Sequence, residues 1–234
     1  MHGRIVFAGN PWPAGHPIDK ARLAASLTRA HGVGLLLHLE TADYDAEGPG
    51  EMGEGDWKAA EVWGNFHACT LSNLEWGYLP ADLPRLDAGR PFAVESLAGR
   101  RLELDPVEAL EDDWSPQDRA FQTYLLGHDA VAEHSLVFAA GSGPDLFNIG
   151  WSGRIALAYV GDYEFRHRFA AELIDAAFEG FELERLPGGE ALRAAEAGML
   201  ARTFLADPDA WVFQSGEAPG APDRLVRRRH TLDT

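Results

Sequence analysis

Alternation of apolar and polar residues runs through much of this chain and predicts strands. In the segment 153–174, a first arm over 154–160 leads to the turn pair Gly161-Asp162, and the return arm has one apolar and one charged face. The apolar positions of the return arm are Tyr163, Phe165, His167, Phe169, Ala171 and Leu173. A period of two is typical of a strand with one face toward a core, so we expect a hairpin here. The alternative is a helix that aligns Phe165, Phe169 and Leu173.

This hairpin is the second along the chain, and a first hairpin is expected over residues 20–41. Leu23 and Leu27 fit a helix capped by Asp19, but the apolar positions of 21–27 also alternate with polar ones. The segment 31–34, His-Gly-Val-Gly, then turns the chain into a strand-like run of equal length over 35–41. Two runs of equal length around a glycine-rich turn favour the hairpin.

The remaining strand-like segments complete a mainly β (α+β) prediction. Their spacing and alternation indicate antiparallel pairing and not parallel βαβ units. We therefore expect an antiparallel β-sandwich or a jelly-roll-like fold. The further segments are 4–8, 60–72, 91–95, 101–104 and 132–139.

Two helices are predicted from their end signals. One is expected near 116–126, because Ser115 is a good cap, Pro116 suits the first helical position and Gly127 follows. The other is expected near 189–205, between Gly188-Gly189 and Asp207-Pro208. The expected buried residues are Phe121, Tyr124 and Leu125 in the first helix and Leu192, Ala195, Met199, Leu200 and Phe204 in the second.

The chain is expected to form one globular domain over 1–216, followed by a loop and a basic tail over 217–234. No internal repeat and no long linker divides it, although the glycine-rich, acidic segment 46–56 is typical of an exposed loop. The tail is expected to be disordered or docked on the chain's own acidic surface. Its arginines are Arg224, Arg227, Arg228 and Arg229.

Composition indicates a packed, disulfide-free protein. The 234 residues are 46% hydrophobic and include 7 Trp, 12 Phe and 5 Tyr, which excludes disorder over most of the length. Cys69 is the only cysteine, so no intramolecular disulfide can form. The N-terminal apolar run is too short for a signal peptide, and every apolar stretch is far below the roughly 20 residues of a membrane-spanning helix. We expect a cytoplasmic protein.

Charge points to the kind of partner. The formal charge is −17, and residues 40–61 hold eight acids against the single base Lys58. Residues 103–118 hold seven acids and no base. Such an excess repels nucleic acid and anionic membranes, so we expect neither as a partner. An acidic face that docks a basic protein is the functional interpretation, and plain solubility is the alternative.

Several histidines and carboxylates have spacings that suit a metal. His38 and Glu40 lie two residues apart, as do His67 and Cys69, and residues i and i+2 of a strand point to the same side. Imidazole and carboxylate groups suit zinc, iron or manganese. The candidate ligands are His38, Glu40, His67, His128 and His134. The alternative is that each histidine is a core or rim residue, because no complete metal motif is present.

Tryptophans are dense in the first third of the chain. If they are exposed together, they form a ligand platform or a protein interface, and if they are buried, they belong to the core. The rigid, proline-rich segment 9–17 is a natural recognition loop after the first strand. The candidate binding residues are Trp12, His16, Trp57, Trp63 and Trp76.

Familiar catalytic and nucleotide-binding motifs are absent. The segment 150–154, Gly-Trp-Ser-Gly-Arg, lacks the final glycine of a nucleophile elbow, and 141–144, Gly-Ser-Gly-Pro, lacks the lysine of a phosphate loop. The leading hypothesis is therefore a binding protein for a basic partner, of the inhibitor or immunity type. The alternative is a metal-dependent hydrolase or isomerase. A third hypothesis is a binder of small molecules or carbohydrates that uses the tryptophans.

Overall fold

The protein is mainly antiparallel β sheet with one α-helix in the part of the chain that the computed structural model describes. That part comprises residues 2–44, 57–59, 63, 68–74, 83–87, 89–109, 119–184, 188–216 and 221–228. The helix is α1 (Glu190–Phe204), and short 3-10 turns lie at Val94–Leu97, Val107–Ala109, Ala158–Val160 and Pro208–Ala210. The strands are β1 (His2–Phe7), β2 (His16–Thr28), β3 (Gly32–Thr41), β4 (Thr70–Ser72), β5 (Arg101–Leu104), β6 (Gln122–Tyr124), β7 (His128–Ala140), β8 (Leu146–Ala156), β9 (His167–Leu183), β10 (Trp211–Gln214) and β11 (Arg224–Arg227).

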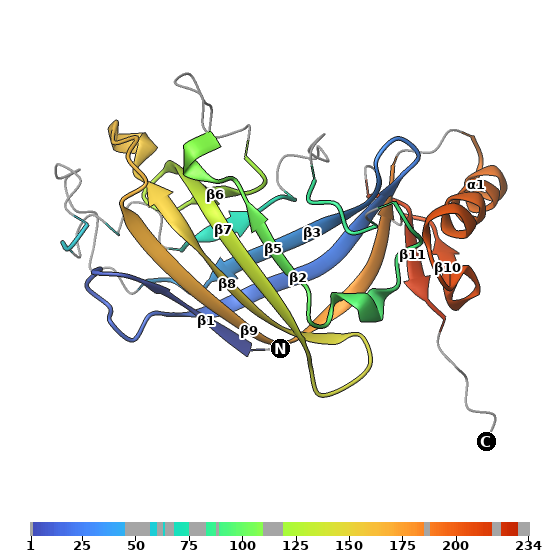
Figure 1. Cartoon of the computed structure of the whole chain (residues 1–234), viewed down its shortest axis with the longest axis horizontal. Helices are drawn as coiled ribbons and strands as arrows, with labels where there is room; N and C mark the ends of the chain where they lie inside the picture. The colour runs from blue at the N-terminus through green and yellow to red at the C-terminus, as the bar shows by residue number, and fades with distance from the viewer. Residues whose placement is uncertain are drawn as a thin grey trace.

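These strands form one continuous sheet that closes on itself (Figure 1). The order is β1-β2-β3-β4-β6-β7-β8-β9-β11-β10, and β5 adds to β7. Closure comes from β9, which pairs antiparallel with β8 and β1 and parallel with β2. The mainly β class is thus confirmed, whereas the two stacked sheets of a sandwich or jelly roll are not.

Strand β9 changes partners because it is long and bent. Its 17 residues pair with β8 and β1 over the first part and with β2 and β11 over the last part. Two residues have positive φ, Asp175 at 53° and Gly180 at 116°. Such residues bend a strand and re-aim it. Figure 1 shows the resulting curve of the β9 ribbon.

The two predicted hairpins are present. β2 and β3 pair antiparallel from Ile18↔Thr41 to Thr28↔Gly32. β8 and β9 pair as expected, but β9 begins only at His167, so residues 157–166 form a longer connection than a two-residue turn. Along β9, Phe169, Ala171 and Leu173 are buried while Arg168 and Glu172 are exposed, which confirms the period of two.

One end of the first hairpin is buried on both faces. Leu35, Leu36 and Leu37 are all inaccessible to solvent. The segment 83–87 pairs with β3 along its edge at this end, since the Leu35 N–H donates to the Pro84 carbonyl and the Leu86 N–H donates to the Val33 carbonyl. The unbroken run of three leucines therefore belongs to a strand that has neighbours on both sides.

The other strand predictions have mixed outcomes. Segments 4–8, 101–104 and 132–139 coincide with β1, β5 and β7. Of 60–72, only residues 70–72 are a strand among those described, and Trp63 lies in a 3-10 conformation. The strand over 91–95 is wrong. Phe92 forms a single bridge to Leu205, and the 3-10 turn of Val94–Leu97 begins two residues later.

The predicted helix near 116–126 is wrong over residues 122–124, which form β6. Pairing with β4 and β7 on either side outweighs the local end signals. Residues 116–118 lie outside the described part. The helix near 189–205 is confirmed as α1, but of the residues expected on its buried face only Leu200 is buried. Ala197, Leu200 and Ala201 are buried, whereas Leu192 and Met199 are exposed.

Residues 224–227 of the expected tail form strand β11 and are therefore docked on the rest of the chain and not disordered. Arg224 contacts Glu182 at 3.1 Å, and Arg227 contacts Asp145 at 2.7 Å. The Arg227 guanidinium also lies 5.0 Å from the ring centre of Trp211. These contacts hold β11 against β9 and β10. Arg229 lies outside the described residues. Within the described part, no helix is long and apolar enough to cross a membrane.

Candidate functional site: an aromatic group around His16

Six aromatic side chains gather around the start of β2. We call them the aromatic group: Phe7, Trp12, His16, Tyr44, Trp57 and Trp63. The ring centres of His16 and Tyr44 lie 4.6 Å apart, those of Trp12 and His16 5.2 Å, and those of Trp57 and Trp63 4.7 Å. Because the six residues come from separate parts of the first 63 positions, only the fold brings them together.

The turn between β1 and β2 places His16 in this group. Phe7 is the last residue of β1, and His16 pairs with Ile5 at the start of β2. The turn needs Gly15, whose φ is +71° and whose added Cβ would lie 2.3 Å from the Ile5 carbonyl oxygen. Glycine is therefore required at this close approach of two backbones.

Asn10 fixes the protonation state of His16. Its Oδ1 accepts the Trp12 N–H at 3.1 Å, so its Nδ2 is the atom that donates to His16 Nε2, also at 3.1 Å. Burial, helped by the charge of Arg4, lowers the pKa of His16 to about 4. At neutral pH the imidazole is thus uncharged and carries its proton on Nδ1.

Hydrogen bonds hold the tryptophans in place. The indole of Trp57 donates to the Ala8 carbonyl at 2.9 Å, and that of Trp63 donates to the Trp57 carbonyl at 3.0 Å. Trp57 also stacks on His167 at 4.1 Å with a 17° interplanar angle. Trp12 and His167 are half-buried, whereas the other rings are buried. The accessible part of the site is therefore Trp12, together with His167, which stacks on Trp57.

Four of the five binding residues predicted from sequence lie in this group: Trp12, His16, Trp57 and Trp63. Trp76 lies outside the described residues. Sequence reasoning missed Phe7, Tyr44 and His167. Phe7 ends the first apolar run, and His167 lies within the alternating run of the second hairpin, but neither pattern identifies which end of the sheet each residue reaches.

The predicted metal ligands that lie within the described residues do not converge. Glu40, Thr70, Tyr124 and His128 are successive partners across β3, β4, β6 and β7. Three strand spacings separate Glu40 from His128, about 14 Å, which is far beyond the span of one coordination sphere. Each side chain near β3 has another contact: His38 with Ser72 at 3.0 Å, and Glu40 with Lys20 at 2.8 Å.

His134 lies apart from these ligands, buried in the interior. Its Nδ1 accepts the indole N–H of Trp151 at 3.2 Å, and its Nε2 lies 3.7 Å from Asp105 Oδ2. Burial, with a smaller effect of Arg119, lowers the pKa of His134 to about 3. With Nδ1 occupied by a donor, the neutral ring carries its proton on Nε2. It therefore has no lone pair free to act as a base or a metal ligand.

No group of three or more His, Cys, Asp or Glu side chains suited to a metal ion is present among the described residues. His67 lies outside them. Cys69 is fully buried, and burial raises the pKa of its thiol to about 12. A thiol that stays protonated is a poor nucleophile, so Cys69 acts as a small apolar side chain.

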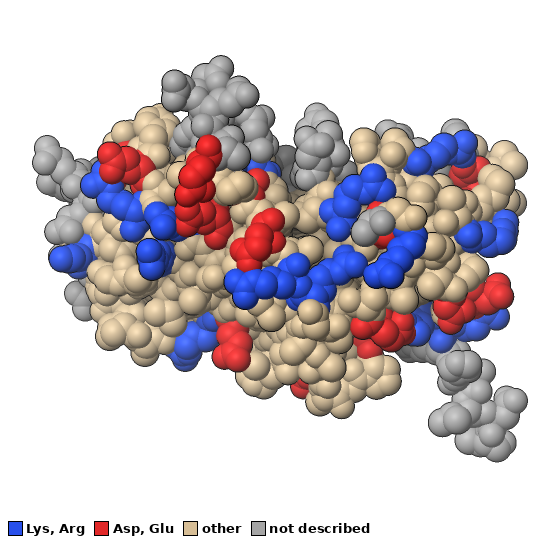
Figure 2. Space-filling view, viewed as in Figure 1, with Lys and Arg blue, Asp and Glu red and all other residues tan. Residues whose placement is uncertain are grey.

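Charge is distributed unevenly along the chain. Of the 37 acidic residues, 14 lie in segments outside the described part, which leaves 23. Of the 20 Lys and Arg residues, 2 lie there, which leaves 18. The described body is thus close to charge balance, and the face in Figure 2 carries both signs. The acid excess is therefore concentrated in short stretches of sequence.

Comparison with protein-family models, with curated proteins and with solved structures finds no match for this chain.

Proposed function

We propose that this chain is a binding protein that takes a Lys or Arg side chain of a basic protein partner on the aromatic group. A protein of this inhibitor or immunity type would act by covering the surface of its partner. The observation that carries the proposal is that acidic residues and members of the aromatic group lie in the same stretch of sequence. One of the two acidic stretches of the sequence, 40–61, also supplies Tyr44 and Trp57 of the aromatic group.

Aromatic rings and carboxylates together favour a cation. A guanidinium or ammonium group over an indole gains about 0.5–2 kcal/mol, and more when water is excluded. The half-buried Trp12 offers such a ring at the surface. His16 lies beside it and adds no positive charge at neutral pH, because its pKa is about 4. Acidic residues close to Tyr44 in the sequence, such as Asp43, increase the rate of encounter with a basic protein.

A cytoplasmic setting is part of the same proposal. Cys69 is the only cysteine and is buried, so the fold needs no oxidising compartment.

The test uses fluorescence anisotropy with labelled peptides. An Arg- and Lys-rich peptide is titrated with the full chain at low salt and again at high salt, and a Glu-rich peptide of equal length serves as the negative probe. We expect binding of the basic peptide only, with an affinity that falls as salt rises. Equal binding of both peptides, or no binding at low salt, would contradict the proposal.

Two variants separate the aromatic group from net charge. Trp12→Ala removes the half-buried ring and is expected to weaken binding about tenfold, the equivalent of about 1.4 kcal/mol. Tyr163→Ala is the matched control, because Tyr163 is 60% exposed and lies in the connection between β8 and β9. If both variants bind like the wild type, attraction is purely electrostatic and the aromatic group is core.

A further inference from the structure

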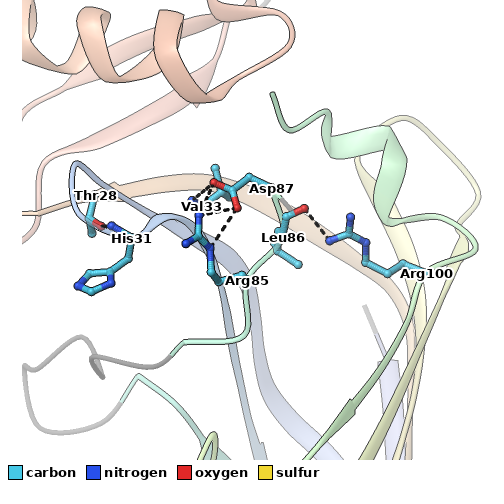
Figure 3. A network of polar contacts seen from close by, with 7 residues as sticks. All are labelled: Thr28, His31, Val33, Arg85, Leu86, Asp87 and Arg100. Carbon is cyan, nitrogen blue, oxygen red and sulfur yellow. Dashed lines mark hydrogen bonds and ion pairs between the residues drawn. The ribbon is translucent and has the colours of Figure 1, made fainter. Parts of the chain in front are cut away.

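Three arginines lie close to the turn that carries the buried Asp87, beside the β2–β3 hairpin: Arg85 contacts its carboxylate, Arg90 bonds its carbonyl through the backbone, and Arg100 bonds the Leu86 carbonyl. We call Arg85, Arg90 and Arg100 the arginine group (Figure 3 shows Arg85, Asp87 and Arg100). Arg85 contacts both carboxylate oxygens of Asp87, with Nη2 at 2.9 Å from Oδ1 and 3.0 Å from Oδ2. Arg90 follows in the same turn, where its N–H donates to the Asp87 carbonyl at 2.8 Å.

Asp87 is fixed and already has partners. Its side chain is 4% exposed, and Oδ2 also accepts the Val33 N–H at 3.4 Å. Gly32 makes room for it, because a Cβ there would lie 2.0 Å from Oδ2. The carboxylate therefore balances one guanidinium, that of Arg85, and has little capacity left for the other two.

The second guanidinium is anchored by backbone. Nη1 of Arg100 donates to the Leu86 carbonyl at 2.8 Å, which directs the side chain toward Asp87 (Figure 3). Neither Arg90 nor Arg100 forms an ion pair with a carboxylate of the described residues. Burial first, and then the charge of Arg90, lower the pKa of Arg100, while the charge of Asp87 raises it, so Arg100 interacts with both groups.

Most arginines elsewhere in the described part have acidic partners. Arg22 contacts Glu179 and Glu182, Arg154 contacts Glu133, and Arg193 contacts Asp223. Arg90 and Arg100 differ from these arginines because both lie close to a carboxylate that is already paired with a third arginine. Repulsion between them is a cost that a bound anion would remove.

We propose that the arginine group is a binding site for a doubly charged oxyanion, namely the phosphate group of a small phosphate monoester. Two positive charges remain after Asp87 is paired, and they match the charge of a phosphate dianion. Guanidinium groups bind phosphate oxygens through two parallel N–H donors. Arg100 and Arg85 are already held by Leu86 and Asp87, so little side-chain freedom is lost on binding. Arg85 and Arg90 are exposed, so the site is open to solvent.

The test is isothermal titration of the full chain with inorganic phosphate at low ionic strength, with sodium chloride as the reference salt. We expect saturable binding of one phosphate per chain. Arg90→Ala and Arg100→Gln should each weaken it at least tenfold. Arg168→Ala is the matched control, since Arg168 is exposed on β9 and should leave phosphate affinity unchanged.

Two results would overturn the proposal: absence of phosphate binding by the wild type, or an equal loss in the Arg168→Ala control. Thermal melts of each variant show whether it is folded. This control is needed because Arg100→Gln removes the contact to Leu86. Arg90→Ala removes no side-chain contact to a described carboxylate. If Arg100→Gln fails to fold, the phosphate affinity of Arg90→Ala alone tests the proposal. A phosphorylated peptide that binds while inorganic phosphate does not would assign the site to a protein partner and would also reject the small-molecule proposal.

Discussion

Trp151 and His134 form a hydrogen bond in the interior of the closed sheet, with the indole nitrogen 3.2 Å from Nδ1. Both side chains are almost inaccessible to solvent. Asp105 faces the opposite ring nitrogen at 3.7 Å, and burial raises the pKa of its carboxyl. His134 therefore remains neutral in the folded protein, although the same side chain in the unfolded chain is protonated below pH 6.5.

This difference predicts a loss of stability in acid. Between pH 6.5 and the folded pKa of about 3, the unfolded chain binds a proton at His134 and the folded chain does not. Stability from this group is therefore complete above pH 6.5 and falls as pH falls, by about 2 kcal/mol between pH 7 and pH 5. Urea unfolding of wild type and His134→Leu at both pH values measures it. The variant should lose about 2 kcal/mol less, and an identical loss in the two proteins would show that His134 titrates normally.

Trp151→Phe should destabilise the fold through the same hydrogen bond. The substitution leaves Nδ1 of a fully buried histidine without its donor, and a buried polar atom that loses its partner costs about 1–3 kcal/mol. A double-mutant cycle with His134→Leu isolates the pair. Coupling near zero would mean that the loss in Trp151→Phe comes from ring size alone.

Gly32→Ala should be more destabilising than Gly99→Ala. Both glycines have positive φ, +67° and +84°, so both substitutions carry a similar backbone cost of about 1 kcal/mol. At Gly32 the new Cβ would also collide with Asp87 Oδ2, whereas at Gly99 no atom lies within 4 Å. Thermal unfolding of the two variants compares them directly. Equal midpoints would mean that Asp87 moves without cost.

Glu182→Gln should loosen the C-terminal strand. Oε1 of Glu182 accepts from Arg22 at 2.7 Å and from Arg224 at 3.1 Å, and its side chain is only 9% exposed. Loss of this shared charge should cost about 1–3 kcal/mol. Glu179→Gln is the control, because Glu179 is 40% exposed and exposed pairs contribute about 1 kcal/mol or less. Hydrogen exchange at 224–227 should rise in the first variant only, and protection equal to wild type would contradict the link.

Local patterns were sufficient to predict the hairpins and helix α1, since each depends on neighbouring residues. Gly188-Gly189 and Asp207-Pro208 bound α1, and the alternation of Phe169, Ala171 and Leu173 continues in β9. The closed sheet was not predictable in this way. It depends on the parallel pairing of Leu23–Leu27 with Phe178–Leu183, which are some 155 positions apart and carry no shared signal.

The candidate site was predictable only as a set of residue types. Dense tryptophans suggested a binding surface, but the meeting of Trp12 with Tyr44 depends on where β2 begins and where β3 ends. The histidines illustrate the opposite outcome. His38, His128 and His134 look alike in sequence, yet cross-strand register and burial place them in three different environments. Proximity in space is set by register, which the alternation of apolar residues does not specify.

The position of β9 in the chain has a consequence for biosynthesis. β1 and β2 are translated well before β9, but each has β9 as a partner, and β9 ends only at Leu183. Closure must wait until most of the 234 residues have been translated. During that interval the edges of β1 and β2 that pair with β9 have no partner strand. Unpaired edges slow folding and promote aggregation of nascent chains. A chaperone that holds the first hairpin should therefore raise the yield of this protein more than one that acts after release.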